Sequence, residues 1–202
     1  MIHTVLFDLG NVLVPLDFDR AYRAASRRTG LSEREVAHLL HDSGLSGPYE
    51  RGEMTSREFH RRMDSLLGLG YAYEPFRHLW CDMFRPEALV DEALLDELDP
   101  QVRIAILSNT NELHWEWIRE RYPVVRRFEK AVLSYEVGAL KPDPAIYAAT
   151  LEAVGARPEE CFFTDDKPEN VEGARAVGIQ AETFVGVEPL REQLAALGLL
   201  RK

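Results

Sequence analysis

The stretch Thr4-Val5-Leu6-Phe7-Asp8-Leu9-Gly10-Asn11 decides the fold of this chain. Its first half is a short apolar, β-prone run, and an acid and a glycine follow it directly. This pattern predicts a buried strand that ends in a turn at Asp8. In open parallel sheets, ligands bind at the carboxyl ends of the strands. An aspartate there can be a nucleophile, a metal ligand or both, although Asp is also common as a cap of turns and helices.

Four more apolar runs predict strands, at 102–107, 131–133, 161–164 and 181–184. Helix-like segments lie around 112–121, 143–154, 168–177 and 188–198. Strand and helix patterns that alternate from residue 86 onward are typical of βαβ units. We therefore predict an α/β fold with a Rossmann-like, doubly wound parallel sheet.

The region from 17 to 84 has a different pattern. Arg, Glu, His and Leu recur at helical spacing, and no run there predicts a strand. Ser32 and Glu35 match a capping box, and Thr55 with Glu58 indicates a second helix start. Direct connections between a strand and the next element are short, so this long gap favours an insertion. We predict a core of residues 1–16 and 85–202, with residues 17–84 as an inserted helical cap domain.

Composition limits the class of function. The 24 basic and 34 acidic residues give a net charge of −10, which disfavours nucleic acid or an anionic membrane as the main partner. No apolar run is long enough to span a bilayer, and no secretory signal is expected. Cys81 and Cys161 lie in apolar surroundings without metal-type spacing, which indicates small core residues. We expect a cytoplasmic protein that is a monomer or a weak homodimer.

Three further polar groups stand out, and two of them directly follow strand-like runs: Ser108-Asn109-Thr110-Asn111 and Asp165-Asp166. The third is Lys141, which precedes a proline and is therefore held in extended backbone. Each group has a simpler explanation. The first can cap a helix near residue 112, the lysine can be solvated, and Asp166 can form a capping box with Glu169.

Taken together, these groups indicate one site, because the carboxyl ends of parallel strands meet at one edge of a sheet. A carboxylate nucleophile, oxygen ligands for Mg²⁺, a lysine and a hydroxyl are the parts of a phosphoryl-transfer site. A small anionic substrate is compatible with the negative net charge, since a metal ion or a lysine can make the local charge inside one pocket positive.

The same residues resemble a known family. The segments Asp8-Leu9-Gly10-Asn11-Val12-Leu13, Ser108-Asn109, Lys141-Pro142 and Asp165-Asp166 resemble the four motifs of the haloacid dehalogenase (HAD) superfamily, in order and spacing. The resemblance covers essentially the whole chain, with 17–84 matching the helical cap. The phrases DLGNVLV, LSNTN, LKPDPAIY and FFTDDKPENVEGA are most similar to bacterial sugar-phosphate phosphatases of the α-D-glucose-1-phosphate phosphatase type. The N-terminal phosphatase domain of epoxide hydrolases is also similar.

The resemblance implies a Mg²⁺-dependent phosphatase in which Asp8 attacks phosphorus and forms an aspartyl-phosphate. It implies that the Asp8 carboxylate, the Gly10 carbonyl and Asp166 hold Mg²⁺, with Asp165 acting directly or through water. The ion would offset the repulsion between the nucleophile and the phosphate dianion.

The resemblance also implies how the substrate is held. Ser108 and backbone N–H groups near Asn109 would bind phosphoryl oxygens, while Lys141 would balance the clustered negative charge and orient the nucleophile. The expected partner is a small phosphorylated metabolite, a sugar phosphate.

One position departs from the family pattern. Phosphatases of the family usually carry a second aspartate two residues after the nucleophile, which protonates the leaving oxygen; here that position is Gly10. We expect a cap residue or a metal-bound water to replace it, and the candidates are Asp17, Asp19, His41 and Glu50. The segment 49–53, which contains Glu50, either approaches the pocket or forms a solvated turn.

Three alternative functions stay open at this point. A phosphotransferase or mutase would use the same aspartyl-phosphate. A 2-haloacid dehalogenase would also lack the second aspartate and would need no metal. The third alternative is a binding module that turns over poorly, which the glycine at position 10 favours.

Overall fold

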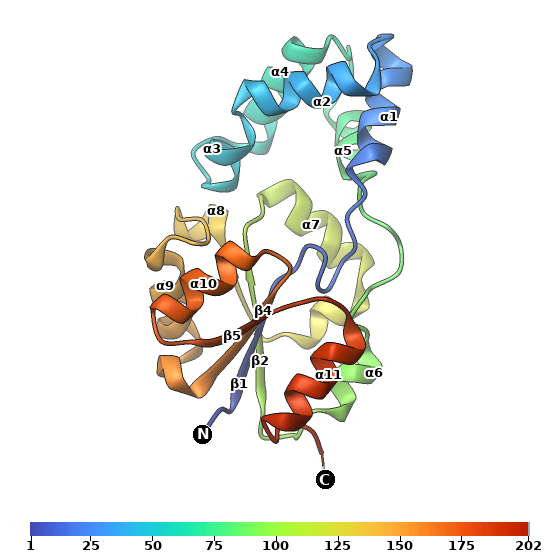
Figure 1. Cartoon of the computed structure of the whole chain (residues 1–202). Helices are drawn as coiled ribbons and strands as arrows, with labels where there is room; N and C mark the ends of the chain where they lie inside the picture. Colours follow the sequence, from blue (N-terminus) through green and yellow to red (C-terminus); the bar gives the residue numbers. More distant parts are fainter. Residues whose placement is uncertain (202) are drawn as a thin grey trace.

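The computed structural model describes residues 1–201. A five-stranded parallel sheet in the order β3-β2-β1-β4-β5 forms its centre (Figure 1). The strands are β1 (Thr4–Phe7), β2 (Arg103–Ser108), β3 (Lys130–Leu133), β4 (Cys161–Asp165) and β5 (Gln180–Thr183). Every predicted strand is present, and the predicted α/β fold is confirmed.

The register of the central strands positions the site. Phe7 pairs with Ile106 on β2 and with Thr164 on β4. The residues that come next, Asp8 and Asp165, therefore lie beside each other where the strands end. The backbone N–H of Asp8 donates to the Thr164 carbonyl at 3.0 Å, which continues the pairing one residue past β1.

Successive residues of a strand point to opposite faces of the sheet. Both faces carry apolar residues here, and helices cover both of them. Leu6 and Phe163 pack with α9 and α10 on one face. Phe7 and Phe162 pack on the other face, in the core that includes residues of α6, α7 and α11. The elements of this part of the chain are α6 (Glu92–Glu97), α7 (Glu112–Arg121), the 3₁₀ helix η1 (Pro123–Arg127), α8 (Ser134–Val137), α9 (Pro144–Val154), the 3₁₀ helix η2 (Pro158–Glu160), α10 (Pro168–Ala176) and α11 (Val187–Ala196).

Five of the six helices that lie between β1 and β2 in the chain sit beyond the carboxyl ends of the strands (Figure 1). These inserted helices are α1 (Phe18–Thr29), α2 (Glu33–Ser43), α3 (Ser46–Glu50), α4 (Ser56–Leu67) and α5 (Tyr73–Cys81). The capping box of Ser32 and Glu35 forms as predicted. The Thr55 hydroxyl caps α4 by accepting from the Glu58 N–H at 3.2 Å.

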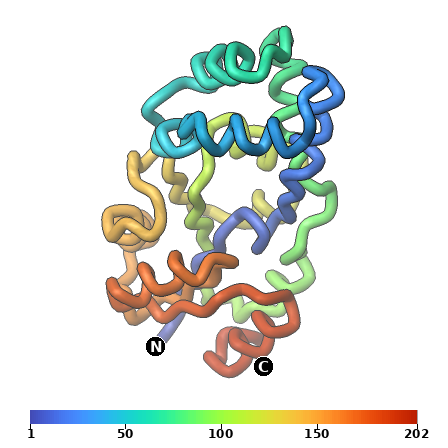
Figure 2. The backbone as a smooth tube through the Cα atoms, turned by 45° about the horizontal axis from the view of Figure 1, so that its top comes forward, coloured from blue at the N-terminus to red at the C-terminus, as the bar shows by residue number. Residues whose placement is uncertain are grey.

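The chain crosses between the sheet and the inserted helices twice, before α1 and after α5 (Figure 2). The two crossings are joined to each other by an antiparallel bridge between Leu16 and Phe84. The Asp17 N–H also donates to the Met83 carbonyl at 2.8 Å. The inserted helices are therefore connected to the sheet through a short two-stranded ladder.

Two helix starts near the site settle alternatives that the sequence leaves open. Asn111 caps α7 by accepting from the His114 N–H at 3.0 Å. A capping box of Asp166 with Glu169 does not form, since α10 begins at Pro168 with Lys167 at its N-cap position. The Lys167 N–H instead donates to Asp165 Oδ1 at 2.8 Å, which leaves Asp166 for another partner.

Both cysteines, Cys81 and Cys161, are buried and free, as expected for small core residues. No helix within residues 1–201 has both the length and the apolar character that a membrane crossing requires.

Candidate active site

Lys141 joins three neighbouring strands, β2, β1 and β4, at their carboxyl ends. Its Nζ donates to Asp8 Oδ1 at 2.7 Å, to Asp165 Oδ2 at 2.5 Å and to the Leu107 carbonyl at 2.9 Å. Burial lowers the pKa of Lys141, but the charges of Asp8 and Asp165 outweigh this effect and hold the pKa above its usual value. Lys141 is thus a buried cation between two acids and not a solvated lysine.

Burial raises the pKa of Asp8 to about 6, although the Lys141 ammonium opposes the rise. The nearby Asp165 carboxylate adds to it. Both effects reflect the cost of placing negative charges close together away from water. A further cation at this position would favour the ionised form of Asp8.

Asp165 is fully buried and its carboxylate has protein partners on both oxygens. The Asn170 amide donates to Oδ1 and Oδ2 at 3.0 Å each, in addition to the bonds from Lys141 and from the Lys167 N–H. A carboxylate has about four lone-pair sites. These four hydrogen bonds occupy them, so Asp165 is suited to fixing Lys141 in place.

Asp166 is less buried and lies beside Asn11. The Asn11 amide donates to Asp166 Oδ2 at 3.1 Å, and its Oδ1 accepts the Leu16 N–H at 3.0 Å. Asn11 has a φ of 55°, a left-handed conformation that Asn tolerates better than most residues. The side chain therefore links the loop after β1 to the loop after β4.

Asp8, Asp165 and Asp166 each offer an oxygen, and these atoms lie within 4.8 Å of one another. Mg²⁺ prefers hard oxygen ligands, and one or two carboxylates usually hold it. The donor set therefore fits a divalent cation. Gly10 lies in the same loop, two residues after Asp8.

Ser108 lies at the end of β2 and is buried. The partner of its hydroxyl within the described residues is the Asn109 carbonyl at 3.5 Å, a long contact. The hydroxyl is therefore able to donate to a bound oxyanion.

Asn109 uses its side chain to hold the backbone of Lys141. Its Oδ1 accepts the Lys141 N–H at 2.7 Å, and its Nδ2 donates to the Lys141 carbonyl at 2.9 Å. The side-chain amide of Asn109 is thus occupied, and the backbone N–H of Asn109 is the part that is available to a ligand.

Three polar residues that support the site were not singled out from the sequence for this role: Asn11, Ser134 and Asn170. Ser134 anchors the loop after β2, with its Oγ accepting the Thr110 N–H and donating to the Thr110 carbonyl, both at 2.9 Å. The sequence signal for each of these residues is a short polar side chain close to one of the motifs. The hydrogen-bond partner of that side chain, however, depends on how the loops are arranged in space.

The comparison with known families agrees with this geometry. The model of haloacid dehalogenase-like hydrolases matches residues 2–178. The chain belongs to this family. Relatives named as phosphatases match over almost its whole length, so the protein is a HAD-like hydrolase of the phosphatase type.

Two relatives and one solved structure illustrate the similarity of this HAD-like phosphatase to others. A D-ribitol-5-phosphate phosphatase from Bacteroides thetaiotaomicron is 28% identical over 191 residues, 91% of each chain. A phosphorylated carbohydrates phosphatase from Thermotoga maritima is 26% identical over 180 residues, 87% of this chain and 82% of the relative. The structure of a HAD family enzyme from Bacteroides thetaiotaomicron, in complex with magnesium and inorganic phosphate, is similar with a TM-score of 0.79 and 29% identity. The match covers 91% of this chain and 94% of the chain in that structure.

In this HAD-like phosphatase, the position of the usual second aspartate, Gly10, lies in a loop that packs against Leu16. A Cβ placed on Gly10 would lie 3.0 Å from Leu16 Cδ1. The Leu16 side chain therefore occupies the space next to position 10. Leu16 itself stands in the chain just before the first crossing to the inserted helices.

Of the four cap acids and bases that the sequence suggests, Glu50 lies in the most suitable environment. Asp17 pairs with Arg85 at 2.7 Å, and the hydrogen bond from Arg85 lowers its pKa. Asp19 and His41 are exposed. Glu50 is half-buried at the end of α3, and burial raises its pKa while the charge of Lys167 opposes the rise. Lys167 directly follows Asp166, so Glu50 lies on the side of the carboxyl ends of the strands.

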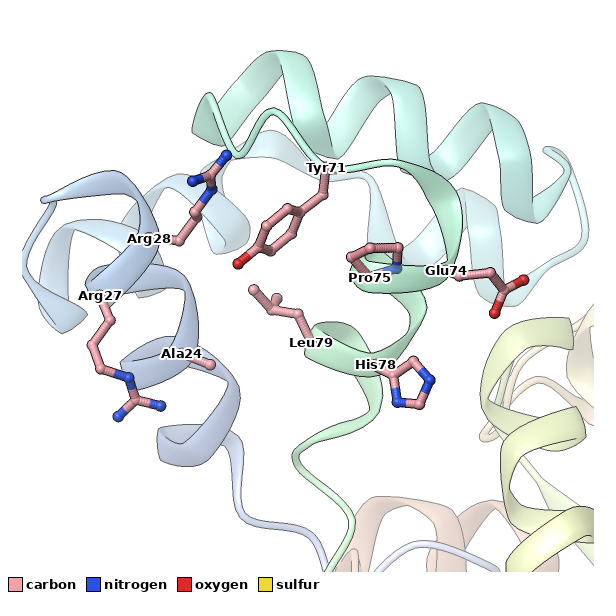
Figure 3. A pocket seen from close by; sticks show the side chains of 8 residues that line it. All are labelled: Ala24, Arg27, Arg28, Tyr71, Glu74, Pro75, His78 and Leu79. Carbon is pink, nitrogen blue, oxygen red and sulfur yellow. The ribbon is translucent and has the colours of Figure 1, made fainter.

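A large surface hollow of this HAD-like phosphatase lies elsewhere. It has a volume of about 670 Å³ and opens between α1 and α5, where Arg27, Arg28, Tyr71 and His78 line it (Figure 3). The Arg28 guanidinium lies over the Tyr71 ring, 4.7 Å from its centroid. None of the four motifs contributes to this hollow, so we do not assign the reaction to it.

Proposed function

We propose that this protein is a Mg²⁺-dependent phosphomonoesterase that hydrolyses a small sugar phosphate or polyol phosphate through an aspartyl-phosphate on Asp8. The observation that carries the proposal is the buried Lys141, which contacts both Asp8 and Asp165 at the strand ends. The similarity to a D-ribitol-5-phosphate phosphatase and to a phosphorylated carbohydrates phosphatase supports the substrate class.

In the first step, a carboxylate oxygen of Asp8 attacks phosphorus, and the bond between phosphorus and the ester oxygen breaks. Lys141 holds Asp8 Oδ1, which leaves the other oxygen to attack. Ser108 donates to a phosphoryl oxygen, together with the backbone N–H of Asn109. Water then attacks the aspartyl-phosphate, releases phosphate and restores the carboxylate.

Asp8, the Gly10 carbonyl and Asp166 would hold Mg²⁺. When bound, the ion neutralises charge on the phosphoryl oxygens. The four hydrogen bonds to the oxygens of Asp165 disfavour a direct contact of this residue with the ion. Its direct role is to hold Lys141 beside the nucleophile.

The leaving oxygen needs a proton, and Glu50 is the cap residue that we assign to supply it. A carboxyl group with a raised pKa can be protonated near neutral pH. The same group, once ionised, can take a proton from the water that attacks the aspartyl-phosphate.

We also propose that residues 17–84 act as a cap domain over a core of residues 1–16 and 85–202. The position of α1–α5 beyond the strand ends supports this division. The net charge of −10 and the free, buried cysteines support a cytoplasmic enzyme with a small-molecule substrate. We expect it to work as a monomer or a weak homodimer.

The deciding experiment measures phosphate release from a panel of sugar, polyol and nucleotide phosphates, with Mg²⁺ and with EDTA. We expect release that EDTA abolishes and that Asp8→Asn eliminates. Transfer of labelled phosphate to an acceptor sugar would instead indicate a phosphotransferase, and halide release from a 2-haloacid without metal would indicate a dehalogenase. Binding of sugar phosphates without turnover would indicate a binding module.

A further inference from the structure

A series of three hydrogen bonds joins the inserted helices to the first turn of α7. The backbone N–H of Leu113 donates to the Tyr49 hydroxyl at 3.3 Å. Tyr49 donates to Ser56 Oγ at 2.8 Å, and Ser56 donates to Glu112 Oε2 at 2.5 Å. Tyr49 lies in α3 and Ser56 begins α4, whereas Glu112 and Leu113 are neighbours in α7. The series therefore leaves α7 at one residue and returns to it at the adjacent one.

The direction of these bonds follows from the groups that make them. A backbone N–H can only donate, so the Tyr49 oxygen accepts from Leu113 and the single hydroxyl proton of Tyr49 goes to Ser56. Ser56 also has a single proton, which it donates to the carboxylate of Glu112. Each donor thus has its own acceptor, which favours one docked position of α3 and α4 on α7.

The Tyr49 ring and the Tyr49 hydroxyl have different roles. The ring stacks on Phe59 of α4, with centroids 4.2 Å apart and planes 15° from parallel. The ring thus packs among the inserted helices, while the hydroxyl reaches α7. Tyr49 and Ser56 are both buried, so loss of a partner would leave the remaining polar groups unpaired away from water. Removal of the hydroxyl alone breaks the contact with α7 and keeps the stacking.

The bond to Leu113 also completes the start of α7. The first N–H groups of a helix have no partner within the helix. In α7, Asn111 accepts the N–H of His114, and Tyr49 accepts the N–H of Leu113. Ser108, to which we assign a phosphoryl oxygen, lies five residues before Leu113 in the chain. The inserted helices therefore supply a partner to the helix that follows the phosphoryl-binding loop.

Tyr49 is also the neighbour of Glu50 in α3. We propose that Tyr49 is a positioning residue, whose hydroxyl holds Glu50 at the carboxyl ends of the strands through its bonds to Leu113 and Ser56. The proposal rests on the proposed function, in which Glu50 supplies the leaving-group proton. A general acid must lie within hydrogen-bond reach of the oxygen that it protonates, so even a small displacement of α3 slows the reaction.

The test uses Tyr49→Phe, which removes the hydroxyl and keeps the ring. We expect kcat/KM to fall about tenfold on an alkyl phosphate and to stay within twofold on p-nitrophenyl phosphate, whose leaving group needs no proton. Ser56→Ala, which removes the acceptor of the Tyr49 proton, should show the same selective loss. The matched control is Tyr135→Phe, which should leave both substrates within twofold. Tyr135 lines a cavity of about 310 Å³ together with Tyr49, but its hydroxyl donates to Glu136 in its own helix.

A double-mutant cycle distinguishes positioning from a general structural role. When Glu50→Gln has already removed the acid, adding Tyr49→Phe should lower kcat/KM on the alkyl phosphate by less than a further twofold. A structural role predicts equal losses on both substrates, and it predicts the full tenfold loss again when Glu50→Gln is present. Either result would overturn the proposal.

Hydrogen exchange of the Leu113 N–H, followed by NMR, tests the contact without activity. We expect exchange at least tenfold faster in Tyr49→Phe than in the wild type, and unchanged in Tyr135→Phe. Unchanged exchange in Tyr49→Phe would overturn the proposal, whatever the kinetics show. If the wild type releases no phosphate while Tyr49→Phe speeds exchange, the proposed function fails and the attachment of α3 to α7 through Tyr49 stands.

Discussion

Gly52, in the loop after α3, lies against the backbone of Tyr135 in α8, so closely that a Cβ on Gly52 would clash with the Tyr135 carbonyl oxygen. Gly52 also has a φ of 71°, which side chains rarely adopt. The contact joins the segment that carries Glu50 to the core.

We predict that Gly52→Ala lowers kcat/KM at least tenfold, because the inserted helices can no longer approach the core at this point. Gly44→Ala is the matched control: Gly44 has a φ of 62°, but a Cβ placed on it would have no atom within 4 Å. It should cost about 1 kcal/mol of stability and leave kcat/KM within twofold. Steady-state kinetics and thermal unfolding of both variants check this, and equal kinetic losses would contradict it.

Removing the charge of Lys141 should leave Asp8 and Asp165 as unpaired buried acids. We predict that Lys141→Met lowers the free energy of unfolding by about 3–5 kcal/mol in EDTA and lowers kcat at least 100-fold. Mg²⁺ should restore part of the lost stability, because it supplies positive charge to the same carboxylates. Urea unfolding with EDTA and with Mg²⁺ measures both effects. A variant as stable as the wild type in EDTA would show that the lysine does not neutralise this pair.

The two hydrogen bonds between Asn109 and the backbone of Lys141 should matter for rate more than for stability. We predict that Asn109→Ala lowers kcat about tenfold, since loss of both bonds lets Lys141 shift away from the nucleophile. Asp143→Ala serves as the control, because it removes the N-cap of α9 only two residues from Lys141. The control should lose about 1 kcal/mol of stability with kcat nearly unchanged. A similar loss of kcat in both variants would point to general loosening of the loop.

Glu50→Gln tests the source of the leaving-group proton. We predict that kcat/KM, which reports the steps up to formation of the aspartyl-phosphate, falls about 100-fold on an alkyl phosphate. The loss of kcat/KM on p-nitrophenyl phosphate should be less than threefold, since that leaving group needs no proton. A general acid must be protonated, so wild-type kcat/KM should fall as pH rises through the pKa of Glu50, and the variant should lack this limb. Asp19→Asn, an exposed acid on α1, should behave as the wild type. Equal losses on both substrates would exclude the acid role.

His114 should make the stability of the protein sensitive to acid. Its pKa is about 3 when folded and about 6.5 when unfolded, so the unfolded chain binds more protons between these values. The stability that this ring contributes is therefore fully present above pH 6.5 and is lost as pH falls. At pH 5 the loss relative to His114→Gln should be about 2 kcal/mol. Urea unfolding of both proteins at pH 7 and pH 5 measures the difference, and parallel pH profiles would contradict it.

The sequence was sufficient to bring Asp8 and Asp165 together, because parallel strands end at one edge of the sheet and acids follow two of them. It also located the helix starts at Ser32 and Thr55, where the cap depends on residues three positions apart. Local patterns of this kind survive folding because neighbours in the chain stay neighbours in space.

Contacts between distant loops could not be predicted in the same way. The bond from Asn11 to Asp166 joins residues 155 positions apart and needs a left-handed backbone at Asn11. The capping box that the sequence allowed as an alternative at Asp166 does not form, since the Lys167 N–H at the start of the helix donates to Asp165. The stacking of the His114 ring on Trp80 brings together residues of α7 and α5, which no spacing in the sequence reveals.

The ladder between Leu16 and Phe84 has a mechanical consequence. Any swing of the inserted helices must be absorbed where the chain crosses, and Leu16 is also hydrogen-bonded through its N–H to Asn11, which holds Asp166. The crossing and the acid cluster are therefore linked through Leu16 and Asn11. A movement of the inserted helices relative to the core would act on Leu16, and through Asn11 it would change the position of the Asp166 carboxylate.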